Sequence, residues 1–254
     1  MGQNTLYKSD TFVNDNIFYL FNKFIYEYDM KDAGYNLSKA YKLLPESKLE
    51  ELGRYKKERR TIEIGNLQRS DSIYKERLKQ AFEEARRMFF EANELETNDI
   101  ISIKKDAIFT SRRCDFQKFL NYIEFRTKHE YTSYIRLNKK IELYYSPYEM
   151  DVKGLGKETI DYHKDYMIKF INQFFEKMET DETDNILRFM RRFIDSYKRR
   201  ELPVGYYRRF DRDPRFDTYD DSLVFYEYWE DQKNDLDISY NYKEVLIKLI
   251  KIPL

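Results

Sequence analysis

Apolar and polar positions follow two different periods along the chain. Between Asp71 and about residue 95, apolar side chains recur every three or four positions, which predicts one long amphipathic helix. From residue 99 to 145 the period shortens to two and short gaps separate the apolar runs, so this region is predicted to form an antiparallel meander packed on the helix. The residues expected to pack together are Tyr74, Leu78, Phe82, Ala85, Phe89 and Ala92 on the helix, with Ile101 and Phe109 above Phe82 and Phe89.

Shorter elements flank these two regions. Residues 24–29 have the aromatic and β-branched character of a strand, and Ala33 to Leu44 has a helical pattern that stops at Pro45. A charged helical stretch runs from Ser47 to Arg60, and helical patterns return beyond Lys157, including one from about Asp181 to Arg200. These patterns predict an α+β fold, in which an antiparallel sheet is backed by helices and followed by a helical C-terminal region.

The sequence predicts a change of organisation at Gly154-Leu155-Gly156, where two glycines separate the strands from the C-terminal helices. We therefore predict a core over residues 1–153, with a helical insert at about 36–70, and a second region over 154–254. The second region contains an acidic stretch from Asp211 to Asp237 and ends in an apolar segment, Val245 to Ile252.

Composition narrows the classes of protein to consider. The 254 residues include 24 Tyr and 19 Phe, enough large rings to build a core although 36% of the residues are charged. The 46 basic and 46 acidic side chains cancel, so binding of nucleic acid would have to rest on local basic patches. No apolar run approaches the length of a membrane span, and we expect no membrane partner.

The few cysteines and histidines restrict the chemistry further. With one cysteine, Cys114, and two histidines, His129 and His163, the chain lacks the ligands of an ordinary zinc site. A single cysteine forms no internal disulfide and fits a reducing compartment, so we expect a cytoplasmic protein. The excess of Lys, Asn, Ile, Tyr, Phe and Asp suggests an AT-rich genome and a phage origin, which would place the protein in the host cytoplasm.

Two aspartates are the strongest candidates for catalysis. Asp29 ends the first strand, and Asp106 is predicted to lie inside a strand from Ile100 to Phe109. If both strands belong to one sheet, both carboxylates emerge on its open face, and their repulsion calls for a cation such as Mg²⁺. By alternation, Asp106 is expected to point away from the face that carries Ile101, Ile103, Ala107 and Phe109.

Each carboxylate also has a purely structural interpretation. Asp29 could cap the helix that follows, because Asp is a favoured residue at a helix N-terminus. Asp106 could be a solvated strand residue paired with a neighbouring lysine.

The order of elements resembles the palm of a nucleic-acid polymerase, with closest likeness to the family B DNA polymerases over about residues 23–145. Asp29-Met30-Lys31-Asp32-Ala33-Gly34-Tyr35 is similar to motif A of that family, although the tyrosine comes one residue later. Lys104-Lys105-Asp106-Ala107 stands at the place of motif C and has one of its two aspartates. The resemblance implies two Mg²⁺ or Mn²⁺ ions held by Asp29 and Asp106, with Asp32 as a further ligand and Tyr35 near the nucleotide.

Basic residues suggest where substrates would bind. In the helical insert, Arg54, Lys57, Arg59 and Arg60 are candidate donors to a triphosphate. The same residues could equally form a solvated helix face. Candidate contacts to nucleic acid are Lys128, Lys139 and Lys140, which resemble a primer-contacting strand, and Arg188, Arg192 and Arg199 of the C-terminal helix.

The sequence thus predicts a metal-dependent nucleotidyltransferase that adds nucleotides to a primer end. Its partners would be nucleic acid and nucleoside triphosphates, with a partner protein subunit left open. Two alternatives stand beside it: a non-enzymatic phage interaction or structural protein, and a carboxylate metal nuclease. Binding of a nucleoside triphosphate would separate a polymerase from a nuclease.

Overall fold

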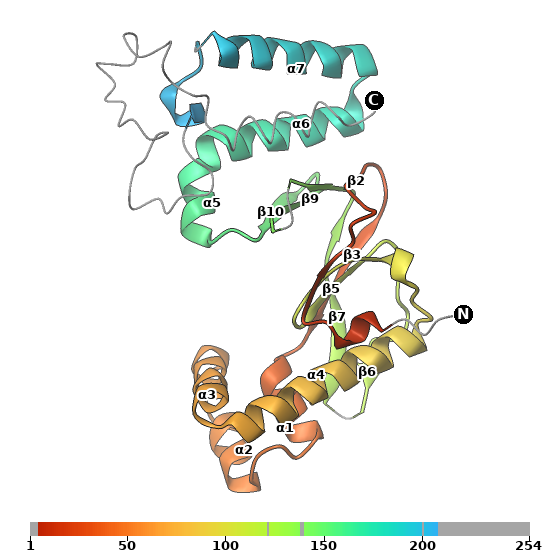
Figure 1. The fold of residues 1–254 in the computed structure, drawn as a ribbon, viewed down its shortest axis with the longest axis vertical. Helices are drawn as coiled ribbons and strands as arrows, with labels where there is room; N and C mark the ends of the chain where they lie inside the picture. Colours follow the sequence, from red (N-terminus) through yellow and green to blue (C-terminus); the bar gives the residue numbers. More distant parts are fainter. Residues whose placement is uncertain (1–4, 121, 138–139, 200, 208–254) are drawn as a thin grey trace. The chain divides into compact units, whose positions relative to one another are not determined.

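The fold comes from a computed structural model that describes residues 5–120, 122–137, 140–199 and 201–207 (Figure 1). The chain forms two compact units. Unit 1 comprises Met1–Ile17 and Phe24–Tyr131, and unit 2 comprises Phe18–Lys23 and Thr132–Leu254. The acidic stretch and the apolar segment predicted near the C-terminus lie outside the described residues. In the described part of the chain, no helix is both long and apolar enough to cross a membrane.

Unit 1 contains a six-stranded antiparallel sheet in the order β1-β4-β5-β3-β7-β6. The central strand β3 lies between β5 and β7, so a residue of β3 has a neighbour on either side. The strands are β1 (Thr11–Val13), β3 (Ile25–Met30), β4 (Ile100–Lys104), β5 (Ala107–Thr110), β6 (Lys118–Phe119) and β7 (Ile123–Tyr131).

The predicted long helix is α4, and its start is fixed by a side chain. The Asp71 carboxylate accepts hydrogen bonds from the backbone N–H groups of Ile73 and Tyr74, both at 2.9 Å, which satisfies two otherwise unpaired donors. The charged stretch from Ser47 to Arg60, predicted as one helix, forms parts of two helices, because α2 ends at Gly53 and α3 begins at Lys57. The helical elements of unit 1 are η1 (Leu6–Lys8), α1 (Ala33–Ala40), α2 (Glu46–Gly53), α3 (Lys57–Ser70), α4 (Ser72–Ala92) and η2 (Thr97–Asp99).

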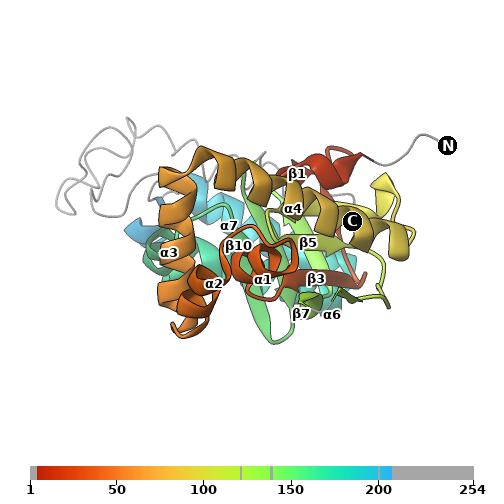
Figure 2. The ribbon, with the colours of Figure 1, turned by 90° about the horizontal axis from the view of Figure 1, so that it is seen from below.

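The apolar stripe of α4 packs on one face of this sheet (Figure 2). The Phe89 ring lies 4.6 Å from that of Phe125 on β7 and 5.2 Å from that of Tyr28 on β3, measured between centroids. All three side chains are fully buried, and each such ring contributes roughly 1.5–3 kcal/mol by leaving water. The expected packing of sheet on helix is therefore confirmed.

Which strand residues face α4 differs from the prediction. A register shift between Ile100 and Ser102 places Ile103 opposite Ile108, on the side of α4, and Ser102 opposite Phe109. The two-residue turn pairs Lys104 with Ala107, so Phe109 shares a face with Ser102, away from α4, rather than lying above Phe89. The bulge displaces Ile101, which likewise lies outside the core formed with α4, and Phe82 is only half-buried.

Unit 2 has its own antiparallel sheet, in the order β10-β9-β8-β2. Its core is formed with α6, where the Phe175 ring stacks on Tyr145 of β9 at 5.0 Å between centroids. The elements are β2 (Tyr19–Leu20), β8 (Ser133–Arg136), β9 (Glu142–Ser146), β10 (Glu149–Lys153), α5 (Lys157–His163), η3 (Lys164–Ile168), α6 (Lys169–Thr180), α7 (Thr183–Lys198) and η4 (Val204–Tyr207).

The meander predicted over residues 99–145 thus divides between two sheets. The change of unit comes between Tyr131 and Thr132, before the glycines at 154 and 156, because β8 pairs with β2 and packs with α6 instead of α4. The predicted fold class, α+β with antiparallel sheets and helices, is confirmed.

Candidate functional site

The face of the unit 1 sheet away from α4 carries acidic residues of the central strand. Strand pairing places Glu27 opposite Phe109 and Asp29 opposite Ala107, whereas Tyr28 and Ile108 between them face α4. Residues directly paired in an antiparallel ladder lie on the same face. Asp29 therefore lies at the end of β3 on the face away from α4, as the sequence predicted, but this face is not open, because Ser102, Ala107 and Phe109 on it are buried.

Asp106 lies in the turn between β4 and β5, not inside a strand as expected. Lys104 pairs with Ala107, which leaves Lys105 and Asp106 as a two-residue turn, and Lys105 adopts a left-handed backbone with φ 56°. Asp is disfavoured inside strands and common in turns, so the polar run Lys104-Lys105-Asp106 was the signal for this turn.

The turn brings Asp106 beside Asp29. The backbone carbonyl of Asp106 accepts a hydrogen bond of 3.0 Å from the N–H of Met30, the residue after Asp29. Asp29 is also paired directly with Ala107, the residue after Asp106. The two predicted catalytic aspartates are therefore neighbours across adjacent strands, although they are 77 positions apart in the sequence (106 minus 29).

The environment of Asp106 disfavours its charged form. Burial raises the pKa of this half-buried carboxyl group, and the charge of Asp29 raises it further. Its own backbone N–H, Lys105 and Lys128 act in the opposite direction and lower the pKa, but the net shift is upward. A cation bound between the two carboxylates would remove the repulsion that contributes to this shift.

Asp29 has one weak partner and does not cap a helix. Its Oδ2 lies 3.4 Å from an Arg126 guanidinium nitrogen, and the Arg126 side chain is 46% exposed, so the pair contributes only about 0–1 kcal/mol. The N-terminal cap position of α1 is occupied by Asp32, and the cap interpretation of Asp29 does not apply.

A third carboxylate on this face, Glu27, was missed from the sequence. Its side chain is 1% exposed and accepts hydrogen bonds from Lys128 Nζ at 3.1 Å and from the Tyr131 hydroxyl at 3.0 Å. The period of two places Glu27 on the same face as Asp29, which was the available signal. The ion pair holds Lys128, a predicted nucleic-acid contact, over this buried carboxylate.

Asp32, predicted as a metal ligand, is instead ion-paired with Arg60, predicted as a nucleotide ligand. Both side chains are 16% exposed, and the Arg60 guanidinium also lies 4.6 Å from the centroid of the Tyr35 ring. The Tyr35 hydroxyl donates to the Leu49 carbonyl at 3.3 Å, which ties α1 to α2. The structure thus brings three predicted site residues together in a contact that joins the helices of the insert.

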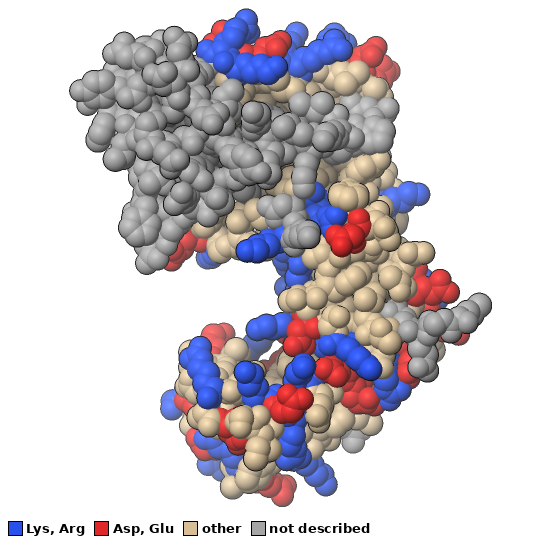
Figure 3. Space-filling view, viewed as in Figure 1, with Lys and Arg blue, Asp and Glu red and all other residues tan. Residues whose placement is uncertain are grey.

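The other basic residues of the insert are exposed. Arg54 and Lys57 lie on the surface, and the Arg59 guanidinium stacks 4.1 Å from the centroid of the Tyr55 ring. Acidic and basic side chains alternate over α1–α4 in Figure 3 rather than forming a patch of one sign.

In unit 2, basic side chains gather over α7 (Figure 3). Lys140 is exposed, and Lys139 lies outside the described residues. Arg188 donates to the Asn185 side chain at 2.7 Å, and Arg199 forms an ion pair of 3.1 Å with Glu201. The exposed basic residues of α7 and its C-terminal cap are Arg188, Arg191, Arg192, Lys198 and Arg199.

Few side chains could bind a metal ion together with Asp29 and Asp106. Within the described ranges, no group of three or more His, Cys, Asp or Glu side chains is arranged to hold a metal ion. Asp29 and Asp106 would have to share an ion with substrate oxygens, which is how Mg²⁺ is commonly bound where phosphates are present.

Comparison with known proteins places the chain in a phage family. The model of the family described as "Bacteriophage PBS1 gene 130 protein" matches residues 1–254, so the chain belongs to that family. The match supports the phage origin suggested by composition, and the description names no activity. A search of curated proteins finds no match to the chain.

Proposed function

We propose that this phage-family protein is a metal-dependent nucleotidyltransferase that adds nucleotides to a primer end in the host cytoplasm. One observation carries the proposal: Asp106, in a hairpin turn, and Asp29, at the end of the central strand, are neighbours at the same end of the sheet. The resemblance to a polymerase palm implies one carboxylate on each of two neighbouring strands, and the proposal keeps that pair although Asp106 lies in the turn.

The residues present fit a pair of Mg²⁺ or Mn²⁺ ions. Two carboxylates of the protein, completed by phosphate oxygens and water, suit ions that prefer oxygen ligands and keep part of their hydration. Such ions would lower the pKa of a primer hydroxyl and offset charge on the triphosphate. The raised pKa of Asp106 fits a carboxyl group whose charged form needs a nearby cation.

The protein's own cations would orient the substrates. Lys128, held by Glu27 and itself 38% exposed, would provide a positive charge for a phosphate of the primer. Arg54, Lys57 and Arg59 are exposed and available to a triphosphate. Because Arg60 is engaged by Asp32, its contribution would be to position α3, and Asp32 is not expected to ligate metal. The exposed arginines of α7 would track a nucleic-acid backbone.

The direct experiment measures extension of labelled DNA and RNA primers with Mg²⁺ or Mn²⁺ and all four nucleotides. Wild-type protein should extend a primer, and Asp106→Asn should not. Asp115→Asn is the matched control, because Asp115 is an exposed aspartate of the same unit. Absence of extension by the wild type under all conditions, or equal extension by Asp106→Asn, would contradict the proposal. Cleavage of the primer without nucleotide addition would indicate the nuclease.

A second candidate function, protein binding, is favoured by exposed aromatic and aliphatic side chains on unit 1. Phe24 and Phe116 are each 62% exposed and Leu120 is 60% exposed, more than a large apolar residue usually shows. A protein with only this function would bind no Mn²⁺ in a manner that depends on Asp106. Calorimetric titration of wild type and Asp106→Asn with Mn²⁺ therefore separates the two candidates.

A further inference from the structure

A buried arginine of α4, Arg86, donates a hydrogen bond to the turn that carries Asp106. The Arg86 side chain is 0% exposed, and its three nitrogens donate to three different acceptors. Nε donates to the Tyr7 carbonyl at 2.7 Å, one terminal nitrogen donates to the Lys105 carbonyl at 2.9 Å, and the other donates to Asp10 Oδ1 at 3.0 Å.

A second link closes the arrangement. The backbone N–H of Lys105 donates to the Asp10 carbonyl at 2.7 Å. Both backbone groups of Lys105 are therefore occupied, its carbonyl by Arg86 and its N–H by Asp10. The N-terminal segment, helix α4 and the β4–β5 turn meet at this one guanidinium, which we call the Arg86 clamp (Arg86, Tyr7, Asp10 and Lys105).

Burial of a guanidinium costs several kcal/mol unless its donors are all satisfied, so an apolar residue would fill this core position at a lower cost in free energy. The planar fork of Arg can reach separate acceptors in fixed directions, whereas a Lys ammonium on a flexible stem holds them less rigidly. Arg86 therefore fixes geometry more than it adds stability, and the geometry it fixes is that of the residue preceding Asp106.

We infer that Arg86 is a positioning residue of the candidate metal site, which holds the Asp106 turn so that its carboxylate meets that of Asp29. This inference rests on the proposed function for its purpose, although the clamp can be tested without any activity. Groups that orient a metal ligand commonly change metal affinity by 10–100-fold when altered.

The adjacent residue provides a matched control. Arg87 lies on the exposed side of α4 and pairs with Glu84 at 2.5 Å and Glu91 at 2.6 Å, three residues before and four residues after it. Arg86→Lys and Arg87→Lys thus make the same chemical change at consecutive positions of one helix, but only the first touches the turn.

The experiment measures amide hydrogen exchange by NMR in both variants, without metal. In Arg86→Lys, the amides of Met30 and Lys105 should exchange about tenfold faster, because both bond to the clamped region. The Ser111 amide, bonded to Asp99 at the far end of the same hairpin, should change little, which separates local loosening from global destabilisation. Arg87→Lys should leave all three amides unchanged.

Mn²⁺ titration then tests the link to the site. Affinity should fall about tenfold or more in Arg86→Lys and stay unchanged in Arg87→Lys. If Arg86→Lys does not fold, Asp10→Asn replaces it, since the Asp10 side chain is 50% exposed and its loss is milder. Equal exchange at Met30, Lys105 and Ser111, or wild-type Mn²⁺ affinity despite a loosened turn, would overturn the inference. A wild type that binds no Mn²⁺ would overturn the proposed function, while the turn amides would still decide whether Arg86 holds the turn.

Discussion

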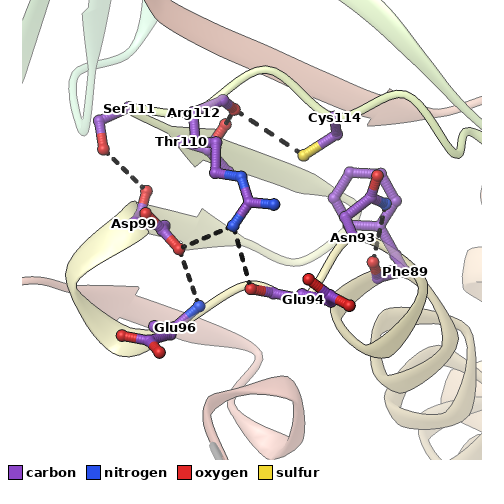
Figure 4. A network of polar contacts seen from close by, with 9 residues as sticks. All are labelled: Phe89, Asn93, Glu94, Glu96, Asp99, Thr110, Ser111, Arg112 and Cys114. Atoms are coloured by element: carbon purple, nitrogen blue, oxygen red, sulfur yellow. Dashed lines mark hydrogen bonds and ion pairs between the residues drawn. The ribbon is translucent and has the colours of Figure 1, made fainter.

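The two ends of the β4–β5 hairpin are built from similar residues and have opposite electrostatic character. At the open end, Asp99 accepts a hydrogen bond of 2.9 Å from the Glu96 N–H and lies 3.9 Å from Arg112 (Figure 4). Arg112 in turn donates to the Glu94 carbonyl at 3.2 Å. The acid at this end is matched by the Arg112 cation and by one backbone donor, the N–H of Glu96.

At the turn end, acids approach each other. Asp106 and Asp29 are neighbours, Asp29 lies 3.4 Å from the exposed Arg126, and Lys128 is bonded to Glu27. The buried cation below the turn, Arg86, directs its hydrogen bonds to Lys105, Asp10 and Tyr7. The charge of Asp29 still raises the pKa of Asp106, so the turn end keeps a pair of acids whose repulsion a bound cation would relieve.

The largest expected effect comes from making the same substitution, Asp to Asn, at each end of the hairpin. Asp106→Asn should lower primer extension by about a thousandfold or more, because a metal ligand acts on several kcal/mol of transition-state stabilisation. Asp99→Asn, the same change at the open end of the hairpin, should leave extension within about twofold of the wild type. Extension rates with saturating Mn²⁺ provide the measurement, and a larger loss for Asp99→Asn would reverse the comparison.

The second effect concerns the thiol at the open end. Cys114 is buried, its N–H donates to the Tyr28 hydroxyl at 2.7 Å, and burial raises the pKa of the thiol to about 11. The thiolate is the reactive form, so alkylation of the native protein at pH 8 should be slower than that of the unfolded chain by a factor on the order of 100. Mass spectrometry after timed iodoacetamide treatment measures both rates. Equal rates would show that this end opens readily.

The third effect is a loss of stability at the open end. Asp99→Asn removes the negative charge facing Arg112 and weakens the bond from Glu96, which should lower the free energy of unfolding by about 1 kcal/mol. Urea unfolding at pH 7 measures the change, with Asp115→Asn as the exposed control. An unchanged midpoint would mean that the contacts of Asp99 with Arg112 and Glu96 do not stabilise the fold.

Much of unit 1 was predictable because it follows local rules. The stripe of α4 and its Asp71 cap are local signals, and the carboxylate at the end of β3 follows from alternation. Two features, a bulge in β4 and the contacts of Arg86, could not be predicted in this way. The bulge between Ile100 and Ser102 lies in an apolar run, where one extra residue leaves no trace in the pattern of apolar positions.

The role of Arg86 was hidden for a different reason. Arg86-Arg87 occurs in a charged helix, and both residues have the same local appearance, yet one is fully buried and the other is paired on the surface. The acceptors of Arg86 come from positions 76–79 residues earlier and 19 residues later. The pairing of Asp32 with Arg60, 28 positions apart, was missed on the same ground. Alternation along the strands and the order of elements identified the candidate aspartates, but only the tertiary fold shows how the cations around them are paired.

The smallest effect is a dependence of stability on pH at the turn end, with a sign opposite to that of an ordinary matched acid. In the folded protein the pKa of Asp106 is raised above its unfolded value by burial and by Asp29, so the folded state holds this proton more tightly. Stability contributed by this group is therefore present at low pH and is lost as pH rises through the unfolded and then the folded pKa.

Asp106→Asn removes that loss and should raise the free energy of unfolding at pH 7 without metal by several tenths of a kcal/mol or leave it level. The gain should vanish when pH falls below the normal range of Asp, because Asp106 is then protonated in both states. Asp99→Asn, by contrast, should be destabilising at pH 7, because it removes the charge facing Arg112. Urea unfolding measures both variants at pH 7 and follows Asp106→Asn across this pH range, and a destabilising Asp106→Asn at pH 7 would identify Asp106 as a structural acid.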